Sequence, residues 1–127
     1  MKRRTKLAIG MLGAVTIGAG GVSALHAQTS GKPAYIIADV DISDLAAYQA
    51  YGAKVPPTLK AYNGRIVVRG KPIPKEGATP QGIIVMLEFD SLADAEKWWS
   101  SPEYSALIPE RQKAAKAQIY IVEGLPR

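Results

Sequence analysis

Four short segments rich in β-branched and aromatic residues constrain the fold of this chain most, because helical stretches separate them in a fixed order. Apolar residues at two-residue spacing, or in a short unbroken run, predict strands. The order strand, helix, strand, strand, helix, strand predicts a ferredoxin-like α+β arrangement, with both helices on one face of a four-stranded antiparallel sheet. The expected strands span residues 34–41, 65–70, 82–89 and 118–123.

The first helical stretch carries one apolar stripe and is interrupted by proline. Ser43 or Asp41 can cap its start, since either side chain can accept a hydrogen bond from a first-turn backbone N–H. Pro56-Pro57 lacks two backbone N–H groups, so we expect a break near Lys54 and a restart with proline in the first turn. Asn63 then ends the helix, because asparagine tolerates positive φ. The stripe consists of Leu45, Tyr48, Val55, Leu59 and Tyr62.

The second half of the chain continues with a loop, a strand and further helices. Three prolines and a glycine predict a loop over residues 71–81. The strand that follows this loop is the most apolar of the four, so we expect it in the centre of the sheet. Ser91 is placed to cap a short helix through Trp99, and Ser101-Pro102 predicts a further helix that runs to about Lys116.

The N-terminal segment has the pattern of a secretory signal peptide. A basic start is followed by the uncharged stretch Leu7–Leu25 and by a small-residue exit. Cleavage after Ala27 or after Ala24 is expected, with an uncleaved anchor as the alternative, because the stretch is just long enough to span a bilayer. Arg3-Arg4 indicates export by the twin-arginine route as an alternative to the general secretory route. Lys6, however, occupies a position where the twin-arginine motif has an apolar residue.

Removal of this segment changes the character of what remains. The chain has 16 basic and 11 acidic residues and a net charge of +5, but four basic residues and the single histidine precede residue 28. The remainder is nearly neutral and has no basic cluster, which argues against nucleic-acid binding. The chain has no cysteine, so an exported fold of this sequence would stand on packing without disulfides.

We therefore expect one exported domain, periplasmic or secreted, that is not attached to a membrane after cleavage. The expected organisation is a signal peptide over residues 1–27, a lead-in over 28–33, the domain over 34–124 and a tail over 125–127.

Alternation along the strands separates the two faces of the sheet. The face with Ala34, Ile36, Ile66 and Val68 is apolar and should face the helices. The opposite face is too apolar for a water-exposed surface, yet it also carries arginines and carboxylates. A second copy packed sheet to sheet would cover it, so we predict a homodimer. On this face we place Tyr35, Ile37, Asp39, Arg65, Val67, Arg69, Ile84, Met86 and Glu88.

Several stretches resemble the motifs of a known family. Asn63-Gly64-Arg65-Ile-Val-Val-Arg69-Gly70 is similar to its Gly-Gly-Arg-x-x-x-Arg-Gly strand, with asparagine for the first glycine. Residues 89–104 are similar to its Phe-x-Ser…Ala…Trp…Ser-x-x-Tyr stretch, and Arg111 and Val122-Glu123-Gly124 also match. Residues 33–124 thus resemble domain-of-unknown-function family 1330. The resemblance implies a dimeric α+β barrel and no assigned reaction.

Charged residues on the uncovered face are the first candidates for a site. Arg65 and Arg69 lie two strand steps apart, and the planar fork of arginine suits a carboxylate or a phosphate. They could therefore capture an anionic or carbonyl-bearing molecule. The alternative is ion pairing with Glu88 on the neighbouring strand and with Asp39 beyond it, since buried charges need partners. The two carboxylates could also form an acid–base pair.

Aromatic residues are further candidates. Several of them could line a pocket for an aromatic or lipophilic ligand, with packing in the core as the alternative, which is favoured for the two on the helix stripe, Tyr48 and Tyr62. The set consists of Tyr35, Tyr48, Tyr51, Tyr62, Trp98, Trp99 and Tyr104. The chain beyond residue 27 has no histidine or cysteine, and its acids lack loop spacing, so we expect no metal and no cofactor. The leading hypothesis is binding of a small organic molecule. The alternatives are a cofactor-independent oxygenase or isomerase, and a structural or stress-related dimer without ligand.

Overall fold

The computed structural model describes residues 31–127, in which four strands form one antiparallel sheet. The strands are β1 (Ala34–Ile42), β2 (Gly64–Gly70), β3 (Ile83–Phe89) and β4 (Ala115–Glu123). Their order across the sheet is β2-β3-β1-β4, so β1 and β3 are central, as predicted for β3. The ferredoxin-like α+β class and the predicted succession of strands are confirmed.

The first helix is continuous. α2 (Leu45–Leu59) runs through Pro56-Pro57, so the predicted break near Lys54 is wrong. Proline removes two helical hydrogen bonds, but the helix is packed against the core on both sides of the prolines, and this packing overrides the local signal. The residues that anchor it are Tyr51, Val55 and Leu59.

The cap at the start of this helix differs from the predicted one, whereas the residue that ends the helical segment is the predicted one. Asp44, and neither Asp41 nor Ser43, caps α2, because its carboxylate accepts a hydrogen bond from the backbone N–H of Ala47 at 3.0 Å. A short turn of 3-10 helix, η1 (Lys60–Tyr62), follows α2. Asn63 ends this turn with a φ of 56°, as its tolerance of the left-handed region predicts.

Three short helices connect β3 to β4, namely α3 (Leu92–Trp99), α4 (Pro102–Ser105) and α5 (Ile108–Ala114). Ser91 and Ser101 cap α3 and α4 as predicted, each accepting a hydrogen bond from a first-turn backbone N–H. The single helix expected from Ser101 to about Lys116 is wrong. Pro109 has no N–H to continue the helical ladder from α4, so α5 starts separately, and β4 begins at Ala115.

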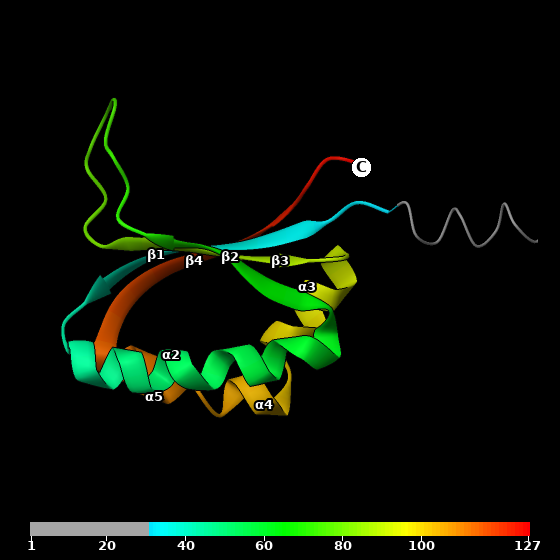
Figure 1. Ribbon diagram of the computed structural model, residues 1–127, viewed down its shortest axis with the longest axis horizontal. Helices are drawn as coiled ribbons and strands as arrows, with labels where there is room; N and C mark the ends of the chain where they lie inside the picture. Colours follow the sequence, from blue (N-terminus) through cyan, green and yellow to red (C-terminus); the bar gives the residue numbers. More distant parts are fainter. Residues whose placement is uncertain (1–30) are drawn as a thin grey trace, which may run out of the picture. The chain divides into compact units, whose positions relative to one another are not determined.

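All the described helices lie on one face of the sheet (Figure 1). The core between these layers is built around Trp98, whose ring stacks on that of Tyr104 with 3.9 Å between centroids. The indole N–H of Trp98 donates a hydrogen bond to the Thr58 hydroxyl at 2.9 Å. On the other side of the sheet, the β2–β3 connection and the C-terminal tail rise away from the helices (Figure 1). We call this uncovered side the outer face and the helix-covered side the inner face.

A β-bulge in β2 changes which side chains reach each face. The pairing with β3 is regular up to Ile66, which lies opposite Leu87, and resumes at Val68, so Val67 is an extra residue. Beyond the bulge, Arg69 lies opposite Val85 and shares the inner face with it. The prediction that Arg69 lies on the outer face and Val68 on the inner face is therefore wrong, because the extra residue shifts the alternation by one.

The predicted signal peptide and the first half of the lead-in lie outside the described residues, so export and cleavage stay predictions. The two ends of the domain meet, because the backbone N–H of Gly124 donates to the carbonyl of Pro33 at 2.7 Å. Between residues 31 and 127, no helix is both long enough and apolar enough to cross a membrane.

Candidate functional site

A cavity of about 60 Å³ lies between α2 and the inner face of the sheet. It adjoins a groove of about 600 Å³ that runs between α2 and the ends of β2 and β3. Tyr48, Gly52 and Arg69 line both spaces and therefore mark the passage between them. Most of the cavity wall is apolar, and its residues include Ile36, Val55, Ile66, Leu87, Trp98 and Ile119.

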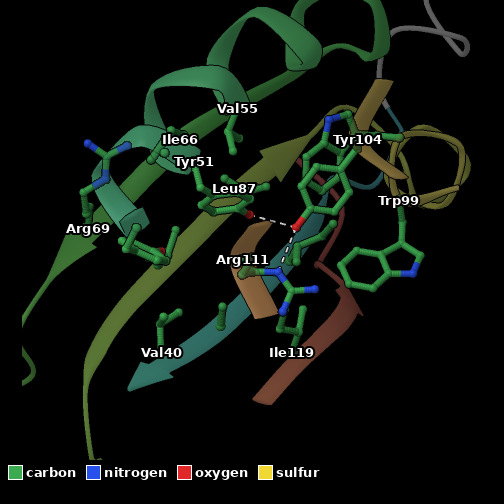
Figure 2. A pocket seen from close by; sticks show the side chains of 16 residues that line it. Val40, Tyr51, Val55, Ile66, Arg69, Leu87, Trp99, Tyr104, Arg111 and Ile119 are labelled. Atoms are coloured by element: carbon green, nitrogen blue, oxygen red, sulfur yellow. Dashed lines mark hydrogen bonds between the residues drawn. The ribbon is translucent and has the colours of Figure 1, made fainter. Parts of the chain in front are cut away.

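Three polar side chains meet at the part of the cavity that does not border the groove (Figure 2). The hydroxyls of Tyr51 and Tyr104 are hydrogen-bonded at 2.8 Å. The Nε–H of Arg111 donates to the Tyr104 hydroxyl at 3.2 Å, and its guanidinium carbon lies 5.9 Å from the ring centroid of Trp99. The three groups come from α2, α4 and α5, so the helical layer as a whole assembles this cluster.

Arg111 is almost fully buried, with 7% of its surface exposed. Five ion pairs form within residues 31–127, and none of them includes Arg111. The Nη groups make no hydrogen bond to any described residue, and Nε bonds only to a neutral hydroxyl. A buried cation is normally paired with an anion, so this guanidinium is the least satisfied group of the site.

Arg69 is the second cation of the site, and it lies apart from Arg111 at the passage to the groove (Figure 2). Its side chain is exposed, and none of the ion pairs within residues 31–127 includes it. The described residues that line the cavity and the groove include no aspartate or glutamate. The two arginines therefore give both spaces a positive potential.

Two tyrosines of the site, Tyr48 and Tyr51, are held in their neutral form. Burial raises the pKa of Tyr51 far above its ordinary value of 10.0, and the neighbouring Tyr104 adds to this rise. Burial also raises the pKa of Tyr48, and the positive charges of Arg69 and Arg111 only partly oppose the effect. These hydroxyls can donate or accept hydrogen bonds near neutral pH, but they are poor proton acceptors for acid–base chemistry.

The candidate charges on the outer face form an internal ion-pair cluster. Arg65 Nη2 lies 3.0 Å from Glu88 Oε1, and Arg65 Nη1 lies 3.4 Å from Asp90 Oδ1. Tyr35 donates a hydrogen bond to Glu88 Oε2 at 3.3 Å, and Arg127 pairs with the same oxygen. The pairing of Arg65 with Glu88 that the strands predict is thus present, and it leaves these groups engaged within the chain.

Asp39 does not join this cluster. It lies on the outer face between Ile84 on β3 and Gln118 on β4, and no arginine pairs with it among the described residues. Its Oδ1 atom is buried without a hydrogen-bond partner among them. The predicted partnership of Asp39 with the arginines is wrong, because the bulge turns Arg69 to the inner face.

Sequence reasoning found part of the inner cluster and missed its charged centre. Trp98 and Tyr104 line the cavity and are also core residues, so each of them both borders a pocket and packs in the core. Arg111 is predicted only as a match to the family motif, and Tyr51 is predicted as a pocket aromatic but not as part of the apolar stripe of the helix. The spacing of Tyr51, Val55 and Leu59 on α2 is the signal that could have placed Tyr51 on the buried face.

No group of three or more aspartate, glutamate, histidine or cysteine side chains that could hold a metal ion occurs between residues 31 and 127. The cavity instead offers hydrogen-bond donors and aromatic rings. This chemistry suits an organic molecule that presents an acceptor.

The family assignment rests on the sequence itself. A family described as a domain of unknown function, DUF1330, matches residues 33–125. The chain belongs to the DUF1330 family. This match confirms the resemblance seen in the motifs and covers nearly the whole described domain. No curated protein matches the sequence.

Solved structures similar to this DUF1330 chain share its fold at low identity. A protein of unknown function from Rhodopseudomonas palustris has a TM-score of 0.61 and 20% identity, covering 83% of this chain and 92% of that one. A dimeric, ferredoxin-like protein of unknown function from Bacteroides fragilis has a TM-score of 0.52 and 19% identity, covering 75% and 98%. SnoaB, a cofactor-independent oxygenase from Streptomyces nogalater, has a TM-score of 0.51 and 5% identity, covering 71% and 89%. These likenesses concern the fold alone.

Proposed function

We propose that this DUF1330 protein is exported, forms a homodimer and binds a small organic molecule in the cavity beneath α2. One observation carries the binding role: a buried, unpaired guanidinium borders a cavity whose walls are otherwise mostly apolar. Small-molecule sites typically combine apolar walls with a few polar groups that orient the ligand. The adjoining groove gives such a molecule a route to solvent and room for its larger part.

Gly52 gives independent support for a space that is kept open. Glycine in the interior of a helix costs roughly 0.5–1 kcal/mol relative to alanine. A Cβ atom at Gly52 would meet nothing within 4 Å, so local packing does not require glycine there. Gly52 lines both the cavity and the groove, and its missing side chain widens the passage between them.

The outer face supports the homodimer. Its centre carries apolar side chains from all four strands, and several are strongly exposed, such as Tyr120 at 55% and Val122 at 46%. A contiguous apolar patch on an uncovered sheet favours association. A second copy is the occupant we propose, because the ferredoxin-like neighbour from Bacteroides fragilis is described as dimeric. We define the outer patch as Ile37, Val68, Ile84, Met86, Tyr120 and Val122.

The unpartnered Oδ1 atom of Asp39 also supports a partner on this face. A buried oxygen without a donor costs about 1–3 kcal/mol, and a donor from a second copy would remove that cost. The atom lies on the same face as the outer patch, next to Gln118.

Binding is better supported than catalysis by an oxygenase-like or isomerase-like enzyme. Such a reaction needs a group that accepts a proton from the substrate. The described residues that line the cavity supply arginines, which stay protonated, and two tyrosines, Tyr48 and Tyr51, whose pKa is raised by burial. The likeness to SnoaB concerns fold, and function is a property of sites.

Filling the cavity tests the proposal. The variant Gly52→Leu places an isobutyl group in the passage without a clash at Cβ. We expect native mass spectrometry of protein from its natural compartment to find a ligand on the wild type and a loss of at least tenfold in its occupancy on the variant. The melting temperature should stay equal or rise, because leucine favours the helix.

Ala50→Leu is the matched control, because Ala50 is an exposed residue of the same helix and lines neither space. It should keep the ligand of the wild type. A ligand-free wild type, or equal occupancy on Gly52→Leu and Ala50→Leu, would contradict binding in this cavity. The same spectra report the mass of the mature chain and of the dimer, so they also test cleavage and assembly.

A further inference from the structure

We infer that the ligand of this cavity is a small organic acid whose carboxylate is bound by Arg111, with its apolar part directed toward the groove. This inference rests on the proposed function and adds the chemical class of the ligand. The Arg111 guanidinium is buried and has no ion-pair partner among residues 31–127.

The guanidinium of Arg111 is oriented but not saturated. The Tyr104 hydroxyl holds Nε at 3.2 Å, and the ring of Trp99 lies 5.9 Å from the guanidinium carbon. These two contacts fix the plane of the fork and stabilise the cation, as does the position of Arg111 in the last turn of α5. Both Nη groups remain without a hydrogen-bond acceptor among residues 31–127, although only 7% of the residue is exposed.

The charge of the surrounding walls excludes an internal partner. The described linings of the cavity and the groove contain no carboxylate, while Arg69 adds a second positive charge at the passage. The acids that could have neutralised the arginines are engaged elsewhere. Glu88 pairs with Arg65 on the outer face, and Glu110, the acid next to Arg111 in sequence, pairs with Lys54 at 2.9 Å. An anion from outside is therefore the complement of this site.

The chemistry of the site selects a carboxylate among anions. Two parallel N–H groups of a planar fork match the two oxygens of a carboxylate. A phosphate dianion needs more donors than one guanidinium and neutral hydroxyls supply, and a cavity of about 60 Å³ with aromatic walls leaves little water to compensate. The cavity thus fits a carboxylate head, and the groove of about 600 Å³ fits a larger apolar body.

Matched probes test the class of ligand. Hexanoate and benzoate are titrated against hexanamide and benzamide, which have similar shapes without the charge, and against inorganic phosphate. Trp98 and Trp99 line the cavity, so their fluorescence reports occupancy, and calorimetry checks the affinity. We expect at least one acid to bind the wild type about tenfold or more tightly than its amide. Gly52→Leu should abolish this binding.

Variants of the two arginines complete the test. Arg111→Met should bring the ratio of acid to amide affinity to about one, and its melting temperature should not fall, because an apolar side chain replaces an unpaired buried charge. Arg111→Lys keeps the charge without the fork and should weaken the acid at least about fivefold. The exposed Arg69→Gln should weaken it about two- to threefold and reduce its dependence on salt.

Each other outcome overturns the inference. Equal binding of acid and amide, displacement of benzoate by phosphate at a lower concentration than by hexanoate, or no acid binding at all would each do so. Loss of folding in Arg111→Met leaves Arg111→Lys and Arg69→Gln as the deciding variants, and unchanged acid binding in both would overturn it. A neutral ligand that Gly52→Leu expels would overturn the carboxylate while leaving the proposed function intact.

Discussion

The two faces of the sheet treat their arginines in opposite ways. On the outer face, Arg65 is 44% exposed and is matched by Glu88 and Asp90 within the same chain. On the inner face, Arg111 is almost fully buried and has only a hydroxyl and an aromatic ring beside it. The exposed arginine of the outer face is neutralised within the chain, whereas the buried Arg111 is not. Charges that balance within the chain serve the fold, whereas an unbalanced buried charge points to a partner from outside.

The apolar side chains of the two faces differ in their exposure to solvent. On the inner face, Phe89 of β3 packs against Trp98 of α3, and both side chains are shielded from solvent. The outer face leaves Tyr120 and Val122 exposed on a surface that no described helix covers. This difference supports the proposal that the inner face binds a ligand and that the outer face mediates assembly, and each of the following changes tests one part of the contrast between the faces.

The largest expected effect is on assembly. Met86→Asp places a carboxylate in the middle of the outer patch, where a sheet-to-sheet contact would bury it without a partner. We expect the dimer dissociation constant to rise at least about 100-fold, which corresponds to about 2.7 kcal/mol, while the circular dichroism spectrum of the monomer is unchanged. Sedimentation velocity over a range of concentrations measures the change.

Ile73→Asp is the control for this variant. Ile73 is a large apolar residue of the β2–β3 connection that is 78% exposed and lies outside the outer patch. Its replacement should leave the dimer intact. A wild type that sediments as a monomer, or equal effects of the two variants, would show that the outer patch is not the interface.

An intermediate effect is expected from the buried tyrosine of the inner face. The pKa of Tyr51 is raised in the folded state, so above pH 10 the unfolded chain loses this proton while the folded chain keeps it. The free energy of unfolding should then fall with increasing pH, by up to about 1.4 kcal/mol per pH unit for this one group, and the contribution is fully present below pH 10.

Urea denaturation between pH 9 and pH 11 measures this slope. Tyr51→Phe should reduce it by the share of one tyrosine, because only the buried hydroxyl of Tyr51 is removed. Equal slopes in wild type and Tyr51→Phe would mean that the inner hydroxyl ionises as freely as an exposed one.

The smallest effect is expected from the outer ion pair. Arg65→Ala removes the contacts with Glu88 and Asp90, but Arg65 and Asp90 are 44% and 57% exposed, so water and salt screen them. Glu88 is only 17% exposed, and it keeps its contacts with Arg127 and Tyr35. The free energy of unfolding should fall by less than about 1 kcal/mol, and the difference should shrink further in high salt. A loss above about 2 kcal/mol would mean that this charge cluster is as important for stability as a core contact.

Most of the fold could be predicted from local patterns. Strand alternation, the serine caps of α3 and α4 and the left-handed Asn63 depend on a few neighbouring residues, and all three are present. The helix through Pro56-Pro57 could not be predicted, because packing on both sides of the prolines outweighs their local cost. The break between α4 and α5 was missed because the prediction started the helix at Ser101-Pro102 and carried it through Pro109, which lies in the first turn of α5.

The site was less predictable because it depends on register and on distant contacts. The even spacing of Arg65 and Arg69 predicts a shared face, and only the pairing with β3 reveals the extra residue between them. Arg111 meets Tyr51 and Tyr104 through the packing of three helices, which no spacing in the sequence encodes. The pairing of Arg65 with Glu88 was predictable, since two neighbouring strands suffice to define it.

The bulge in β2 has a consequence for aligning this chain with its relatives. Val67 is the supernumerary residue, and it precedes an identical side chain, Val68. An in-frame loss of either valine codon would leave Arg65 outside and Arg69 at the cavity, because the strand would return to plain alternation with one residue fewer. A one-residue gap between the two arginines in a homologue therefore marks preserved geometry, whereas an ungapped relative whose strand lacks the bulge would have moved the second arginine to the opposite face.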